Sequence, residues 1–243
     1  MTIDIMTLFP GLIESVMHES IIGRAQGKNL VTIRATNIRD FATDKHHKAD
    51  DSPYGGGRGM VMLPEPLFLC HQALCAGEHV HTVLMSAQGK AFTQQKAREL
   101  LDRGRFILVC GHYEGVDQRF IDTCVDEEIS IGDFVLTGGE IPAMAVADAV
   151  CRMVPGVLPD ETAFQEESHW DGLLEYPQYT HPALWRGQAV PDVLLSGHHA
   201  NISRWRRKMS LRRTRRDRPD VFAAFSPADK LDRKLLAELD DED

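Results

Sequence analysis

The chain has 243 residues, enough for one large domain or two smaller ones with their own hydrophobic cores. No apolar run is long enough to span a bilayer, and the first residues lack the basic segment of a signal peptide, so we expect a cytoplasmic protein with no membrane partner. The five cysteines are an odd number without C-x-x-C spacing, which argues against a disulfide framework and a structural zinc site.

Strand-like and helix-like segments alternate through the first two-thirds of the chain. Apolar runs predict strands at residues 3–8, 79–85, 106–110 and 128–136. Helical patterns occur at residues 11–18, 64–74, 94–101, 117–124 and 141–154. The run 106–110 is apolar at every position, which is typical of a strand buried on both faces. This alternation predicts an α/β fold with a parallel sheet covered by helices on both faces.

The sequence changes character after residue 154. Residues 160–171 are polar and acidic with little periodicity, which indicates a flexible linker. A proline-punctuated stretch follows, then a basic helix from about residue 201 and an amphipathic helix at 228–239. We therefore expect an α/β domain at 1–159, a linker at 160–172 and a small helical domain at 173–243.

Basic residues are concentrated in this last part of an otherwise acidic chain. The net charge is −9, yet residues 201–219 hold nine Arg and Lys residues and one Asp. Because this segment carries +8, the remainder of the chain carries −17. A solvated face normally mixes both signs, so the segment predicts a site for a polyanion such as RNA. Its candidate phosphate-binding residues are Arg204, Arg206, Arg207, Lys208, Arg212, Arg213 and Arg215.

Three polar or glycine-rich loops follow predicted strands, at residues 84–89, 110–117 and 130–144. Each loop alone is compatible with an ordinary turn between a strand and a helix. The carboxyl ends of parallel strands share one edge of the sheet, however, and α/β proteins bind ligands at that edge. The convergence of three such loops therefore favours a ligand site.

A fourth loop, residues 50–60, has four glycines beside Arg58. Its backbone can approach a phosphate or a ribose closely, although a flexible surface turn explains the same glycines equally well. No Gly-Lys-Ser/Thr follows, so the loop is not the phosphate-binding loop of an NTPase.

Several motifs in this chain resemble those of the bacterial tRNA (guanine-N1)-methyltransferase family, in the same order and spacing from residue 1 to about residue 216. They stand at residues 8–10, 51–57, 111–115, 130–140, 155–158, 172–174, 179–180 and 194–198. The resemblance implies a trefoil knot in the α/β domain, which is an exception to the usual absence of threaded chains. It also implies an obligate homodimer with active sites at the subunit interface.

The resemblance implies methyl transfer from S-adenosylmethionine to the guanosine 3′ to the tRNA anticodon, at position 37. The cofactor would lie in the three loops, against Leu84, Met85, Ser86, Gln88, Gly111, Tyr113, Glu114, Ile131, Gly132, Asp133, Phe134, Val135, Leu136, Gly138, Gly139 and Pro142. Asp50 and Arg58 would contact tRNA together with the basic helix. The resemblance also allows a magnesium requirement, although the sequence shows no motif for a protein metal site.

Two catalytic residues follow from the same resemblance. Arg152, after the helix at 141–154, matches the arginine that stabilises negative charge, although helix-dipole compensation also explains an arginine there. Glu167 stands where the family commonly has an aspartate as general base, and its neighbour Glu166 is an alternative. The chain also has Ala163 where the family has a serine, and His181 where it has an arginine.

Two other functions are compatible with these patterns. A related knotted methyltransferase acting on a ribose 2′-hydroxyl would need no base to remove the guanine N1 proton. An RNA- and cofactor-binding protein without catalysis would explain the departures at Ala163 and Glu167.

Overall fold

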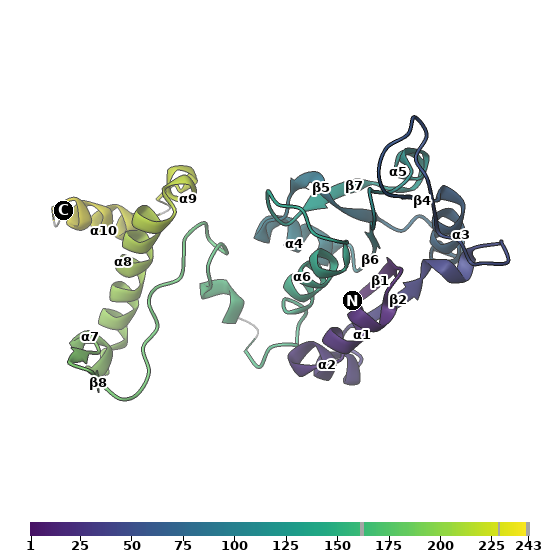
Figure 1. Cartoon of the computed structure of the whole chain (residues 1–243). Coiled ribbons are helices and arrows are strands. Elements are labelled where there is room, and N and C mark those ends of the chain that lie inside the picture. The colour runs from purple at the N-terminus through teal and green to yellow at the C-terminus, as the bar shows by residue number, and fades with distance from the viewer. Residues whose placement is uncertain (161–162, 228, 242–243) are drawn as a thin grey trace. The chain divides into compact units, whose positions relative to one another are not determined.

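The computed structural model describes residues 1–160, 163–227 and 229–241, and the chain divides into two compact units, Met1–Glu161 and Thr162–Asp243 (Figure 1). The first unit contains a five-stranded sheet in the order β2-β1-β6-β5-β7, in which every neighbouring pair is parallel. The strands are β1 (Thr2–Thr7), β2 (Thr32–Asn37), β5 (Thr82–Ala91), β6 (Arg105–Cys110) and β7 (Glu127–Ser130). The predicted α/β class with a parallel sheet is confirmed.

Helices cover both faces of this sheet (Figure 1). α3 (Pro64–Cys75) and α5 (Gln118–Cys124) pack together on one face. α1 (Pro10–Met17), α4 (Gln94–Asp102) and α6 (Glu140–Cys151) pack on the other, and α2 (Ser20–Gly27) follows α1. Two short strands, β3 (Asp50–Asp51) and β4 (Val61–Met62), form an antiparallel pair beside the sheet, and a 3-10 turn, η1 (Ile38–Phe41), follows β2.

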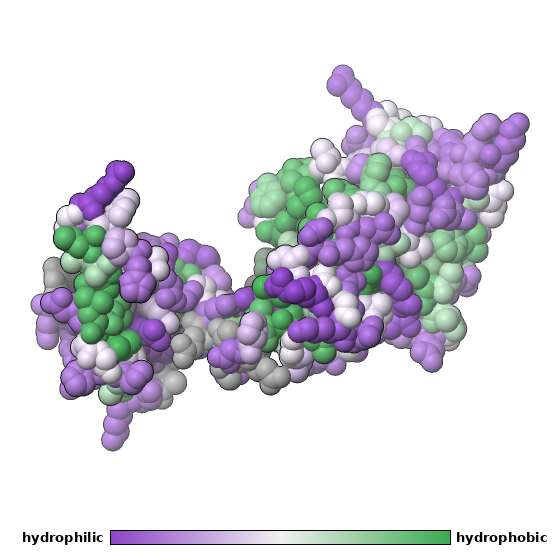
Figure 2. Space-filling model, turned by 90° about the horizontal axis from the view of Figure 1, so that it is seen from below, coloured by the Kyte–Doolittle hydropathy of each residue, from purple (hydrophilic) through white to green (hydrophobic). Residues whose placement is uncertain are grey.

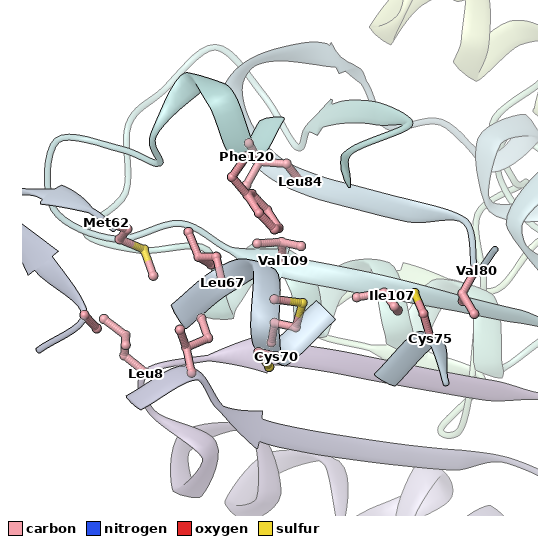
Figure 3. Close-up of a cluster of buried hydrophobic side chains, with 13 residues drawn as sticks. Leu8, Met62, Leu67, Cys70, Cys75, Val80, Leu84, Ile107, Val109 and Phe120 are labelled. Carbon is pink, nitrogen blue, oxygen red and sulfur yellow. The ribbon is translucent and has the colours of Figure 1, made fainter. Parts of the chain in front are cut away.

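The central strand β6 is buried on both faces, because hydrophobic side chains pack on each side of the sheet. All residues from Phe106 to Cys110 are fully buried. Side chains alternate along a strand, and Ile107 and Val109 pack against Leu67 of α3 and Phe120 of α5 (Figure 3). The absence of alternation between apolar and polar residues at 106–110 therefore reflects burial of the strand on both faces.

The cysteines serve as small apolar side chains of this core. All five are free thiols. Burial raises the pKa of Cys70 and that of Cys151 to about 12, with a smaller contribution from nearby aspartates. Burial also raises the pKa of Cys110 well above its usual value.

Two predicted strand boundaries were wrong. The strand predicted at 128–136 ends at Ser130, because the Ser130 hydroxyl bonds with the backbone of Gly132 and turns the chain out of the sheet. The strand predicted at 79–85 begins at Thr82 and continues to Ala91. Its pairing with β7 shifts between Met85 and Lys90, so the predicted loop at 84–89 is a bulge within a long strand.

The second unit is mainly helical. It contains η2 (Ala163–Glu166), a hairpin of β8 (Leu184–Trp185) and β9 (Gln188–Ala189), and the helices α7 (Asp192–Leu195), α8 (His199–Asp217), α9 (Pro219–Ala224) and α10 (Lys230–Asp240). Leu173, Leu211, Leu235 and Leu239 form its buried core. α10 begins later than the predicted 228–239 helix, because the Asp229 side chain caps it by accepting a hydrogen bond from the Asp232 N–H at 2.8 Å. None of the helices in the described parts of the chain combines the length and the hydrophobicity that a membrane-spanning helix needs.

Candidate active site

A pocket of about 390 Å³ lies where the loops after β6 and β7 meet the bulge of β5. Of the residues predicted to contact the cofactor, all except Asp133 line this pocket. They come from three segments that are remote in sequence, and the adjacent positions of β6, β5 and β7 in the sheet bring them to one edge. Cofactor binding by these residues stays a prediction.

Two glycines allow the loops to approach each other closely. The Gly139 N–H donates to the Gly111 carbonyl at 2.8 Å, and Gly138 forms an isolated bridge with His112. A Cβ atom at Gly139 would lie 2.7 Å from the Cα of Cys110, which is closer than real Cβ atoms come to backbone. The close contact between these two loops, which line the pocket, therefore requires a glycine at position 139.

We expect Gly139→Ala to lower both cofactor affinity and the free energy of unfolding. Overpacking against a rigid backbone costs about 1–3 kcal/mol. Urea unfolding measures the stability, and calorimetric titration with S-adenosylmethionine measures the affinity. Gly11→Ala is the matched control, because a Cβ at Gly11 has no atom within 4 Å. Equal effects of the two substitutions would contradict the role given to Gly139.

A buried carboxylate beneath the pocket is a residue that sequence reasoning missed. Glu140, the first residue of α6, is 3% exposed, and its Oε1 accepts a hydrogen bond from the Thr7 hydroxyl at 2.8 Å. Its Oε2 lies 3.6 Å from Nδ1 of His112, which itself lines the pocket. Glu140 thus links β1, α6 and the loop after β6. The available signal was a charged residue directly after Gly-Gly at the start of an apolar helix.

The glycine-rich loop at 50–60 lies against the same edge of the sheet. The Glu114 N–H donates to the Met60 carbonyl at 3.0 Å, and a Cβ at Gly59 would meet the Glu114 side chain at 2.3 Å. Tyr113, at a φ of +59°, is 42% exposed, and its hydroxyl accepts a hydrogen bond from Arg39 at 3.0 Å.

Both tRNA-binding residues predicted in that loop lie near this edge. Asp50 of β3 lies 4.0 Å from the same guanidinium of Arg39. Arg58 is exposed in the loop that contacts Glu114. The loop therefore borders the pocket rather than standing apart from it.

The two predicted catalytic residues belong to different units. Arg152 is the C-cap residue of α6 and is half-buried in the first unit. Glu167 follows η2 in the second unit, where it lines a cavity of about 210 Å³ together with Tyr176, Arg206 and Arg207. The side chains of Ala163 and Glu166, which the sequence also singled out, lie outside the described residues.

All seven predicted phosphate-binding residues of the basic segment stand on α8. Several of them contact groups of the second unit itself: Arg204 and Lys208 contact Glu238, Arg207 contacts Asp171 and Asp232, Arg213 contacts Asp217, and Arg215 contacts Asp240. The Arg206 guanidinium lies 4.7 Å from the ring centroid of Tyr176. In the described part of the chain, no group of three or more His, Cys, Asp or Glu residues is arranged to hold a metal ion.

The structure is that of an α/β protein with a pocket at the carboxyl edge of a parallel sheet, where proteins of this class bind ligands. The family described as tRNA (Guanine-1)-methyltransferase TrmD matches residues 1–224. A tRNA (guanine-N(1)-)-methyltransferase of Ruminiclostridium cellulolyticum is 56% identical over 224 residues, covering 91% of this chain and 96% of the relative. The enzyme of the same description from Brevibacillus brevis is 51% identical over 242 residues, covering 100% and 99%. The chain therefore belongs to the tRNA (guanine-1)-methyltransferase TrmD family, and it is a methyltransferase.

Proposed function

We propose that this protein transfers a methyl group from S-adenosylmethionine to N1 of the guanosine at position 37 of tRNA, 3′ to the anticodon. The observation that carries the proposal is the pocket at the sheet edge, formed by the three loops that the family resemblance assigns to the cofactor. We further propose that the enzyme acts in the cytoplasm.

The residues of the pocket fit such a cofactor. Its volume of about 390 Å³ lies within the usual range of roughly 300–1,000 Å³ for small-molecule sites. The absence of side chains at Gly138 and Gly139 leaves room beside His112 and Cys110 for the close approach of the two loops. Leu84, Ile131 and Pro142 supply apolar surface, and Ser86, Gln88 and Glu114 supply polar groups. When bound, S-adenosylmethionine supplies an electrophilic methyl group on a sulfonium.

A carboxylate and an arginine complete the proposed chemistry. Guanine N1 carries a proton at neutral pH and becomes a good nucleophile only as that proton leaves. Glu167 accepts the proton as general base. Arg152 stabilises the negative charge that develops on guanine O6.

The family also supplies two structural proposals, a trefoil knot in the first unit and a homodimer with active sites at the subunit interface. Exposed apolar side chains of the first unit support the dimer (Figure 2). Leu12 and Val16 lie one turn apart on α1 and are 45% and 49% exposed, while Phe9 and Ile141 are 46% and 55% exposed. α1 packs against α6, so these side chains belong to neighbouring elements. Apolar surface of this kind is typical of protein–protein contacts.

Methyl transfer from labelled cofactor to tRNA transcripts tests the proposed function. We expect labelling of a transcript with guanosine at position 37 and none of the matched transcript with adenosine there. Analysis of the labelled nucleoside distinguishes methylation at N1 from methylation of a ribose 2′-hydroxyl. Binding of tRNA without any transfer would contradict the catalytic function.

A further inference from the structure

Helix α10 covers one face of the basic helix α8. Leu235 and Leu239 of α10 and Leu211 of α8 are fully buried in one cluster, with Phe222 and Phe225 packed against it. The matched family region ends at residue 224, before α10 begins at Lys230. Its buried leucines make α10 an integral part of the second unit.

A buried ion pair fixes α10 to α8. Asp232 is 2% exposed, and its carboxylate accepts hydrogen bonds from Nε and Nη2 of Arg207 at 2.7 and 2.8 Å. These bonds, together with the contact to Asp171, outweigh desolvation and raise the pKa of the Arg207 guanidinium further above its usual value. The positive charge of Arg207 is thus neutralised inside the unit.

Two further acids of α10 contact the same face of α8. Glu238 contacts Arg204 and Lys208, the latter at 3.5 Å. Asp240 Oδ1 accepts a hydrogen bond from Arg215 at 2.7 Å. Positions 204, 208, 211 and 215 follow the spacing of one helix face. Four of the seven predicted phosphate-binding residues therefore already face carboxylates of α10.

The chain segment at 173–176 covers a second side of α8. The Leu174 N–H donates to the Thr214 hydroxyl at 2.8 Å, and Arg206 stacks on Tyr176. The remaining side carries Arg213 and Arg216, whose side chains are 46% and 72% exposed. Because an α-helix turns about 100° per residue, Arg213 lies opposite Arg204.

Surface contacts hold these two exposed arginines, and Arg213 also donates a hydrogen bond to the Glu175 carbonyl at 3.4 Å. Both contact Asp217, whose side chain is 37% exposed, and ion pairs at such a surface are weak and screened by salt. A phosphate group can therefore replace Asp217 at these arginines more readily than it can replace the buried Asp232 at Arg207.

We propose that the carboxylates of α10 occupy one face of α8 by pairing with its basic side chains. They thereby direct an RNA backbone to the opposite face of α8, at Arg213 and Arg216. The carboxylates of Glu238 and Asp240 repel phosphates from the α10 side, so that RNA docks in one orientation. This inference rests on the proposed tRNA substrate. It limits the phosphate-binding part of the basic segment to the strip that carries Arg213 and Arg216.

Binding of fluorescent tRNA transcript by the full chain, measured over a range of salt concentrations, tests the proposal. Each phosphate contact contributes about one unit to the slope of log affinity against log salt. We expect Arg213→Gln with Arg216→Gln to weaken binding at least tenfold and to reduce the slope by about two. Arg204→Gln should reduce the slope by less than half a unit. Arg233→Gln, which removes a cation from the exposed side of α10, is the matched control for net charge.

Neutralising the acids tests the second half of the proposal. Glu238→Gln with Asp240→Asn should strengthen binding of a single-stranded polyuridine at least threefold, because the α10 face then accepts phosphates. Unchanged polyuridine binding, or a slope that falls as much with Arg204→Gln as with the double Arg213 and Arg216 variant, would overturn the proposal. Circular dichroism of each variant checks that the substitution leaves the protein folded. Methyl transfer by the unmodified protein is measured separately, so a failure of the proposed function is seen independently of these affinities.

Discussion

Replacement of Glu167 by glutamine should slow the methyl transfer step about 10²- to 10⁴-fold, which is the usual contribution of a general base. Glutamine preserves the size of the side chain and removes its ability to accept the guanine N1 proton. Single-turnover transfer with saturating cofactor and tRNA measures this step without the contribution of product release.

The neighbouring acids make this experiment specific. Glu166→Gln tests the alternative base, and Glu175→Gln is the control for loss of a negative charge on the same segment. A slow step in Glu166→Gln alone would assign the base to Glu166. If single-turnover rates of both Glu166→Gln and Glu167→Gln equal that of the unmodified protein, neither carboxylate removes the proton and the mechanism is wrong.

Replacement of Arg152 by methionine should lower the rate of transfer about 10²- to 10³-fold, comparable to the loss of one donor to a developing oxyanion. Methionine preserves much of the apolar length of the side chain and removes the charge. Arg152→Lys should recover part of the rate, since a lysine restores the charge but not the forked geometry of the guanidinium.

Arg103 provides the matched control for Arg152. Each is the C-cap residue of its helix, Arg103 after α4 and Arg152 after α6. Compensation of the helix dipole is therefore similar at both positions. Methionine at Arg103 should leave the rate near that of the unmodified protein. Equal rates of methyl transfer by the Arg103→Met and Arg152→Met variants would show that Arg152 has only a structural role.

Local patterns predicted the central part of the fold. The run at 106–110 identified a doubly buried strand because burial on both faces leaves no polar position. The edge strand β2 and helix α2 were missed. β2 mixes exposed and half-buried residues, and Arg34 projects from it to a buried partner, Asp4, at 2.7 Å. Such a contact between residues far apart in sequence gives no local signal.

Local sequence patterns predicted the candidate site to about the same extent as the fold. The glycine-rich loops marked the edge of the sheet because backbone without side chains is needed where loops approach each other. The contact between Thr7 and Glu140 joins residues 133 positions apart, so nothing in either segment indicates it. The acids that contact α8 come from α10. Asp232 lies 25 residues after its partner Arg207, and Glu238 lies 34 residues after its partner Arg204. Charge counting found the basic segment but could not assign its faces.

The buried thiol of Cys110 bears on the proposed binding of an electrophilic methyl donor in the neighbouring pocket. Cys110 ends β6, directly before Gly111 of the pocket, and it is fully buried. A thiolate at this position would be the strongest nucleophile near a methyl donor, because the thiolate and not the thiol is the reactive form. Burial, reinforced by the negative charge of Glu140, raises the pKa of Cys110 well above its usual value. The packing that buries this sulfur therefore disfavours the reactive thiolate beside the pocket in which we propose that the methyl donor binds.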